Sequence, residues 1–260
     1  MQPGFFWEIA GLRKNHNFFY EKFLMAVAVA VTSLAASAGL PGDMFNHVGV
    51  GVGVGTTGIS VEASTPITRW VQMRAGVAIM PSIKFHADAD AEFEYHTNAG
   101  NVYTDSEVEL TGDLGRTQGY VIFNVYPLPK IGLYVALGAY FGGNKLVKIT
   151  GYSPELASYG GSVTIGDYVI PANNKGEVSG GIKVNGFRPY VGIGWGKAVP
   201  SRRINFGIDL GVQIHGKPSL YTDYGELDLS EVTDDDTFQK IMDKVRVYPT
   251  LTFKLGFRAY

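Results

Sequence analysis

The sequence predicts an all-β protein, an eight-stranded antiparallel transmembrane β-barrel with long polar external loops. Three observations lead to this fold class. Apolar residues alternate with polar or small residues over long stretches from Val48 to the carboxyl terminus, which is the period of a strand with two different faces. The connections between these stretches alternate between short and long. An apolar segment of the type used for export precedes them, so residues 39–260 are expected to form the barrel as one domain.

The composition agrees with this fold class and excludes several kinds of site. The 260 residues are 45% hydrophobic, with a mean hydropathy of +0.04 and a formal net charge of −2. A transmembrane barrel has the average hydropathy of a soluble protein because its apolar residues alternate along the strand. There is no cysteine, which excludes disulfides, thiolate metal sites and cysteine nucleophiles. The charge argues against a nucleic-acid partner, and no cofactor is expected, because the Val-Gly repeat at 49–55 is not a nucleotide-binding motif.

Residues 1–38 are predicted to be a signal peptide. The segment from Phe23 to Ala38 is apolar, follows Lys22, and ends in the small-x-small motif Ala36-Ser37-Ala38, as secretory signal peptides do. We therefore expect export and cleavage near Ala38. The alternative is an uncleaved anchor, but the apolar core is shorter than the roughly 20 residues of a transmembrane helix, and no basic flank follows it.

Residues 48–63 are expected to form a β-hairpin. The apolar residues occupy even positions up to Val54 and odd positions from Ile59 onward. A hairpin with its tip at Gly55-Thr56-Thr57-Gly58 explains this change, because it pairs Val54 with Ile59 and Val52 with Val61 on one face. The alternative is a bulge in one long strand, because Thr-Thr is a poor two-residue turn. The hairpin makes the number of strands eight.

The other strands are expected near 71–85, 107–126, 131–141, 187–195, 204–215 and 245–258, the second being the least regular. In the stretch 204–215, the apolar row from Ile204 to Ile214 lies opposite a row that contains Asn205, Asp209, Gln213 and His215. Lipid cannot satisfy the hydrogen bonds of such a polar row. We therefore assign the polar sides to the interior and the apolar sides to the outside.

The connections indicate which kind of barrel this is. Those at 65–69, 126–130 and 196–202 are short and contain proline, whereas those at 87–106, 151–183 and 223–243 are long and polar. Short periplasmic turns and long external loops are typical of outer-membrane barrels. The alternative is a soluble lipocalin-like barrel or a sandwich, in which the apolar sides would line a cavity or a core.

A series of short motifs is spaced as in a known family. The motifs are Gly58-Ile59-Ser60-Val61-Glu62, Met73-Arg74-Ala75-Gly76, Asn124-Val125-Tyr126-Pro127, Arg188-Pro189-Tyr190-Val191-Gly192-Ile193-Gly194-Trp195-Gly196, Phe206-Gly207-Ile208-Asp209-Leu210-Gly211-Val212 and Val247-Tyr248-Pro249. On these motifs, residues 45–260 resemble the ornithine-uptake-porin type of outer-membrane protein, broadly like the OmpW and OmpX barrels. The resemblance implies a bacterial outer-membrane location and eight strands. Such barrels end on an outward-facing aromatic residue, whereas here the apolar row passes through Phe257 and Tyr260 lies beyond it.

The polar sides of the strands supply the candidate selectivity residues. These are Glu62, Arg74, Tyr120, Tyr134, Tyr140, Arg188, Tyr190, Asp209, His215, Arg246, Lys254 and Arg258. One interpretation is an electrostatic filter that passes small anionic or zwitterionic solutes. The other is a plugged interior, in which Arg74 and Arg188 pair with Glu62 and Asp209. The narrow interior of an eight-stranded barrel favours the plugged form, with the four tyrosines filling space left by Gly49, Gly51 and Gly53.

Two further features have a functional and a simpler interpretation. His86 and His215, both expected near the outer rim, are candidates for a metal site or an acid/base pair, but rim histidines are usually just solvated. The acidic stretches 87–109 and 223–243 are suited to divalent cations beside lipopolysaccharide or to basic solutes such as ornithine, and otherwise are solvated loops. Within the second, residues 234–242 are expected to form a short helix. We predict no catalytic residue and no metal site.

The function expected from the sequence is therefore a narrow porin-like channel for small solutes such as basic amino acids. Its expected partners are outer-membrane lipids, lipopolysaccharide, the outer-membrane assembly machinery and a small solute. The first alternative is a non-conducting structural or surface-interaction barrel. The second is a lipid-modifying barrel enzyme.

Overall fold

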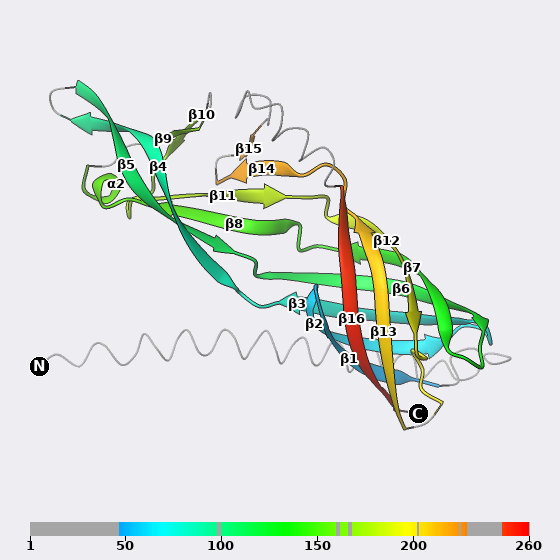
Figure 1. Cartoon of the computed structure of the whole chain (residues 1–260). Helices are drawn as coiled ribbons and strands as arrows, with labels where there is room; N and C mark the ends of the chain where they lie inside the picture. The colour runs from blue at the N-terminus through cyan, green and yellow to red at the C-terminus, as the bar shows by residue number, and fades with distance from the viewer. Residues whose placement is uncertain are drawn as a thin grey trace, which may run out of the picture.

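The computed structural model describes residues 47–97, 100–159, 162–165, 168–201, 203–223, 225–227 and 246–259. The predicted signal peptide, its cleavage site and the predicted helix at 234–242 lie outside the described residues. The described chain forms two antiparallel sheets, a closed barrel and an open sheet that continues from one end of it (Figure 1).

The barrel has eight strands, as the sequence predicts, in the closed order β1-β16-β13-β12-β7-β6-β3-β2. Their bounds are β1 Gly49–Gly55, β2 Gly58–Pro66, β3 Val71–Met80, β6 Arg116–Leu128, β7 Leu133–Phe141, β12 Phe187–Trp195, β13 Ile204–Ile214 and β16 Val247–Arg258. The first and last strands close the barrel by pairing Gly49 with Arg258 and Gly55 with Thr252.

The amino-terminal hairpin is confirmed in its register. Val54 lies opposite Ile59 and Val52 lies opposite Val61. The turn is closed by Gly58, whose φ of 96° is a conformation that L side chains rarely adopt. A glycine directly after the Thr-Thr pair therefore allows a tip that the two threonines alone would disfavour.

The strands bury their polar sides and expose their apolar sides. In β12, exposed and buried residues alternate without a break, with Val191 43% and Ile193 57% exposed on one side and Arg188 1% and Tyr190 4% exposed on the other. A soluble lipocalin-like barrel would have the opposite distribution, because its apolar side lines the cavity. The lipocalin-like alternative, in which the apolar sides line a cavity, is therefore wrong for this chain.

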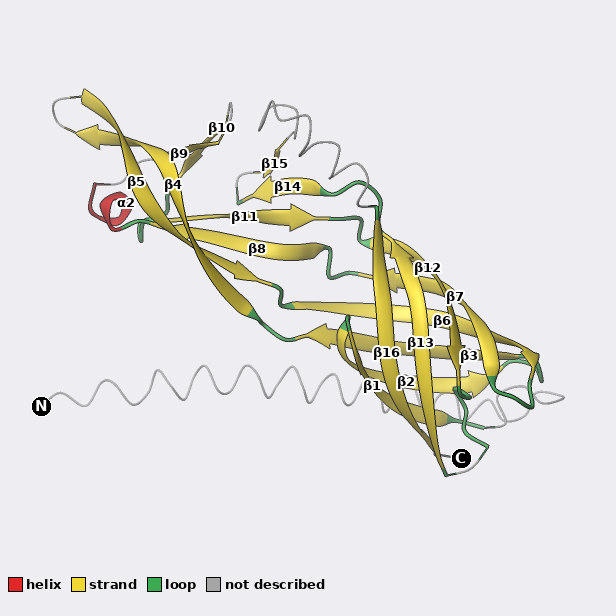
Figure 2. Ribbon diagram, in the orientation of Figure 1, coloured by secondary structure: helices red, strands yellow, loops and turns green. Residues whose placement is uncertain are grey.

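The long connections are not the polar loops that the sequence predicts. They form a second sheet of eight strands in the order β10-β9-β4-β5-β8-β11-β14-β15 (Figure 2). The bounds are β4 Lys84–Thr97, β5 Gly100–Asp113, β8 Lys145–Tyr152, β9 Ser162–Ile165, β10 Tyr168–Pro171, β11 Glu177–Lys183, β14 Ser219–Thr222 and β15 Gly225–Leu227. The order β4-β5-β8-β11-β14 repeats the barrel order β3-β6-β7-β12-β13, so this sheet extends five barrel strands beyond the barrel.

A short helix, α2 (Pro154–Tyr159), packs on the second sheet. Leu156 is buried against Val108, with Leu110 and Val178 beside them. No helix within the described ranges is long and apolar enough to span a membrane.

The single irregular strand predicted over 107–126 has a short break at residues 114–115. It is therefore two strands, β5 in the second sheet and β6 in the barrel. Asp113 holds this break, because its carboxylate accepts hydrogen bonds from the Gly115 amide at 2.7 Å and from the Ser82 hydroxyl at 2.8 Å. These bonds lower the pKa of Asp113 below its ordinary value, that from Gly115 contributing most.

Both ends of the described chain lie at the barrel end that carries the short turns. His47 and Arg258 meet there, with the guanidinium 2.9 Å from the ring Nδ1. The turns at 67–70, 129–132 and 196–201 lie at the same end, and the second sheet projects from the other (Figure 1). The predicted separation of short from long connections is therefore confirmed.

Candidate functional site

The interior of the barrel is the candidate site, because it contains most of the residues that the sequence selects. Nine of the twelve predicted residues are buried, and the side chain of Lys254 is only 11% exposed. The nine are Glu62, Arg74, Tyr120, Tyr134, Tyr140, Arg188, Tyr190, Asp209 and His215. They form an ion-pair network, a tyrosine cluster and a separate arginine layer.

The ion-pair network crosses the whole barrel. Arg74 on β3 donates to Asp209 on β13, and these two strands are separated by three others in either direction around the barrel. The same guanidinium donates to Glu62 on β2 at 3.3 Å and to the Asn124 amide oxygen on β6 at 3.1 Å. Arg74 therefore connects opposite walls of the lumen with three different acceptors, as the plugged interpretation requires.

A second cation completes the network. Lys254 on β16 donates to Asp209 at 3.2 Å and to the Tyr134 hydroxyl at 2.8 Å. The Tyr120 hydroxyl donates to Glu62 at 2.9 Å. Two positive and two negative side chains thus neutralise one another, which is how buried charges are tolerated.

The tyrosines fill the lumen around this network. The rings of Tyr120 and Tyr140 lie 5.2 Å apart, and those of Tyr140 and Tyr190 lie 5.4 Å apart. Tyr126 adds a ring 5.3 Å from that of Tyr134. Centroid separations in this range are typical of packed aromatic pairs, so the space between the strands is occupied by side chains.

The glycines that make room for the tyrosines are not the ones that the sequence analysis selected. A Cβ at Gly194 would overlap the ring of Tyr134, and one at Gly192 or Gly211 would overlap Tyr190. Gly51 instead lies against Glu62, and Gly53 against Ser60. The reason is geometric: each tyrosine lies over its own strand or an adjacent one, and β1 is not adjacent to β6, β7 or β12.

Arg188 forms a layer of its own with neutral acceptors. It donates to the side-chain oxygens of Gln213 at 3.1 Å and Gln118 at 2.9 Å, and to the backbone oxygens of Asn185 at 3.0 Å and Gly142 at 2.6 Å. The predicted pairing of Arg188 with Glu62 or Asp209 is therefore wrong, because amide and carbonyl oxygens take its donors.

The remaining predicted residues lie at the ends of strands. Arg246, which precedes β16, and Arg258, at its end, are exposed rather than in the closed interior. His215 is buried just after β13, whereas His86 is exposed on β4 of the second sheet. Across the described part of the chain, no group of three or more acidic or histidine side chains is arranged to hold a metal ion.

Several interior residues are absent from the twelve predicted selectivity residues. Asn124, Gln118 and Gln213 supply acceptors for the two arginines, and Tyr126 bonds the Gly196 oxygen and the Ala198 amide in the turn after β12. Gln118, Asn124 and Tyr126 share even numbering with Tyr120 on β6, so the alternation contained the signal.

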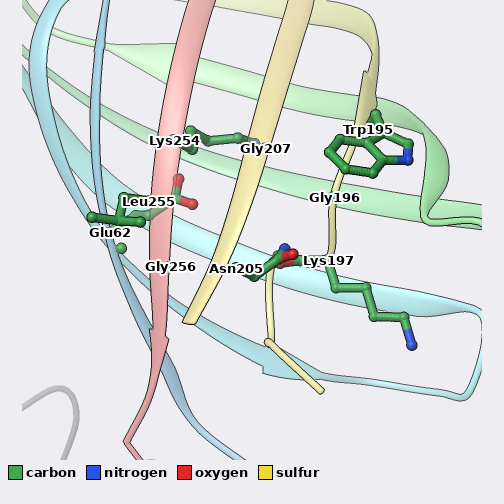
Figure 3. A pocket seen from close by; sticks show the side chains of 11 residues that line it. Glu62, Trp195, Gly196, Lys197, Asn205, Gly207, Lys254, Leu255 and Gly256 are labelled. Carbon is green, nitrogen blue, oxygen red and sulfur yellow. The ribbon is translucent and has the colours of Figure 1, made fainter. Parts of the chain in front are cut away.

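A small pocket lies between the ion-pair network and the short-turn end of the barrel. It is lined by Glu62 and Lys254 together with Gly196 and Lys197 from the turn after β12 (Figure 3). The pocket therefore has charged side chains in its wall, but the ion-pair network and the tyrosines separate this pocket from the other end of the barrel.

The comparisons with known proteins return similar structures only. The sequence matches no protein-family model and no curated protein. The structure of CarO2 from Acinetobacter baumannii is similar at 21% identity and a TM-score of 0.47, covering 82% of this chain and 98% of that one. The structure of CarO from the same organism is similar at 17% identity and a TM-score of 0.42, and the match covers 80% of this chain and 96% of that one. The structure of a major outer membrane protein from Thermus thermophilus is similar at 15% identity and a TM-score of 0.36, and the match covers 82% of this chain and 98% of that one.

Proposed function

We propose that this chain is an outer-membrane β-barrel whose lumen is closed by its own side chains and whose second sheet serves as an interaction surface outside the membrane. The observation that carries this proposal is the inverted barrel wall, apolar outside and charged inside, with the inner charges bonded across the lumen. It makes the non-conducting surface barrel the first candidate and the channel the second.

The outward side chains support a membrane location. Apolar residues point outward on every barrel strand; examples are Phe206, which is 69% exposed, and Leu210, which is 54% exposed. Water would not tolerate an apolar band of this extent on a soluble monomer. The barrel strands have 7 to 13 residues, which brackets the 9 to 11 residues of a typical transmembrane strand.

The two ends of the barrel support an orientation with the second sheet on the cell surface. The short turns are at one rim, as on the periplasmic side of outer-membrane barrels. At that rim Phe257 is 41% exposed on the outer face of the last strand. We assign it the role of the outward aromatic that the assembly machinery reads, in place of Tyr260. Lipopolysaccharide would then surround the opposite rim.

The interior supports the closed state. Arg74 is bonded to three acceptors on three strands, and Lys254 is bonded to Asp209 and to the Tyr134 hydroxyl. The interior carboxylates are held by cations, which argues against a role for them as acid or base catalysts. We therefore infer a protein that is not an enzyme.

The second candidate function, a narrow channel for small solutes such as basic amino acids, has one specific observation in its favour. Asp209 accepts from both Arg74 and Lys254, so a cationic solute that replaced either donor would leave the other in place. Opening would have to displace the Arg74 ion pair, and this is the step that a conductance experiment can detect.

Cysteine labelling in intact cells tests the first proposal, since the chain has no cysteine of its own. Lys175 is exposed in the turn before β11 and Lys130 is exposed in the short turn after β6. A membrane-impermeant maleimide should label Lys175→Cys in intact cells and Lys130→Cys only after the outer membrane is opened. Reversed labelling would overturn the orientation, and recovery of both variants in the soluble fraction would overturn the location.

A further inference from the structure

We infer that the groove on the outer wall at the short-turn rim, between the turn after β6 and the turn after β12, binds an anionic phospholipid through Lys130 and Lys197. This inference rests on the proposed membrane location. The groove encloses about 390 Å³ and is lined by residues of the two turns and by the start of β13.

The apolar wall of the groove is suited to acyl chains. Ile131, Trp195 and Ile204 are each 53% exposed, and Phe206 is 69% exposed. The indole of Trp195 is fixed in place, because its Nε1 donates to the Ile131 oxygen at 2.9 Å. Tryptophan at a membrane rim typically sits at the level of the lipid headgroups, so the chains would lie on one side of this ring and the headgroup on the other.

The polar wall is suited to a phosphate. Lys130 and Lys197 both line the groove, one from each turn. Lys197 is positioned by two neighbours. Its Nζ donates to the Ser201 hydroxyl at 2.9 Å, and its backbone oxygen accepts from the side-chain amide of Asn205 at 2.9 Å. In Figure 3 the side chains of Trp195 and Lys197 lie on the opposite side of the view from Glu62.

The charge of the rim supports an anionic occupant. The sequence has no Asp or Glu in 64–73, 126–134 or 195–206, the stretches that contain the three short turns, whereas these contain Arg69, Lys130, Lys197, Arg202 and Arg203. Basic side chains near a bilayer surface attract anionic lipids, and the attraction decays within a Debye length. A neutral lipid would satisfy the apolar wall but not the two lysines.

Trp195 provides the test, because replacing Trp7 and Trp70 with phenylalanine leaves it as the only tryptophan of the three. The protein is reconstituted in phosphatidylcholine vesicles that contain a minor fraction of brominated phosphatidylglycerol or the same fraction of brominated phosphatidylcholine. Both lipids should quench Trp195, and phosphatidylglycerol should quench it more than its mole fraction predicts. In the Lys130→Gln/Lys197→Gln variant this preference should fall by roughly tenfold, to near the level of phosphatidylcholine.

The Lys84→Gln/Lys148→Gln variant is the matched control, because both lysines are exposed on the second sheet, and it should keep the preference. Equal quenching by the two lipids would overturn the inference and leave the membrane barrel intact. Absence of quenching by either would overturn the membrane location itself. Millimolar inorganic phosphate should not remove the preference, and if it did, the site would be one for free phosphate rather than for a lipid.

Discussion

Arg74 and Asp209 form an ion pair between β3 and β13, strands on opposite sides of the barrel. The two residues are separated by 135 positions in sequence, and Glu62 and Lys254 flank them on the neighbouring strands β2 and β16. The pair therefore both closes the lumen and joins the amino-terminal and carboxyl-terminal halves of the chain.

Loss of the Arg74 charge should destabilise the barrel strongly. In Arg74→Met, Glu62 keeps its charge without a cation, and breaking a buried pair in this way costs about 3–5 kcal/mol. The Glu62→Gln/Arg74→Met variant should recover part of this free energy of unfolding, because Asp209 and Lys254 then remain as a balanced pair. Urea titration of the protein folded in lipid vesicles measures the free energy of unfolding of both variants. Lys84→Met, on an exposed strand, should change stability by less than about 0.5 kcal/mol, and an equally small effect of Arg74→Met would contradict the network.

A methyl group at Gly194 should also destabilise the barrel. The added Cβ would overlap the ring of Tyr134 and the backbone oxygen of Ile208, and overpacking of this kind costs about 1–3 kcal/mol. Gly119→Ala is the control, because the nearest atom to its added Cβ is the Gly76 oxygen at 3.9 Å. The same urea titration distinguishes them. If both variants were equally stable, Tyr134 would not be packed as described.

The joint between the two sheets should weaken in acid. The pKa of Asp113 is lowered by its bonds from Gly115 and Ser82, so the ionised carboxylate stabilises the folded joint. That stabilisation is complete above the ordinary aspartate pKa and is lost as the pH falls through the lowered pKa. Hydrogen exchange at the Gly115 amide should therefore lose its protection, corrected for intrinsic exchange, over that range. In Asp113→Asn the protection should be low and independent of pH, whereas a native-like pH profile in this variant would assign the effect to another group.

The sequence predicts the barrel well because each strand has two chemically different sides. The even-numbered row of β6 and the polar row of β13 both lie inside, and the change of parity between Val54 and Ile59 correctly locates a turn. The partners of the interior charges were harder to predict. Arg74 contacts the expected carboxylates, whereas Arg188 donates to amide and backbone oxygens. Strand order and tilt decide which residues lie opposite each other across a lumen, and neither can be read from the alternation.

The second sheet was missed for a physical reason. Its strand β4 alternates small residues such as Ala87 and Ala89 with Asp88 and Asp90, and acidic residues are rare in strands. Such a stretch looks like a solvated loop when it is read alone. It becomes a strand because β3 and β6, already paired in the barrel wall, hold β4 and β5 side by side as far as the pair Thr97 and Gly100.

Ion conductance in planar bilayers tests the closed lumen most directly. The native protein should give no steady conductance under conditions in which a control porin opens, because the Arg74 network and the tyrosine cluster fill the interior. The Glu62→Gln/Arg74→Ala variant, which removes the cross-barrel donor while keeping the interior charge balanced, should conduct. Stable channels in the native protein, with a conductance that this variant does not change, would contradict the account.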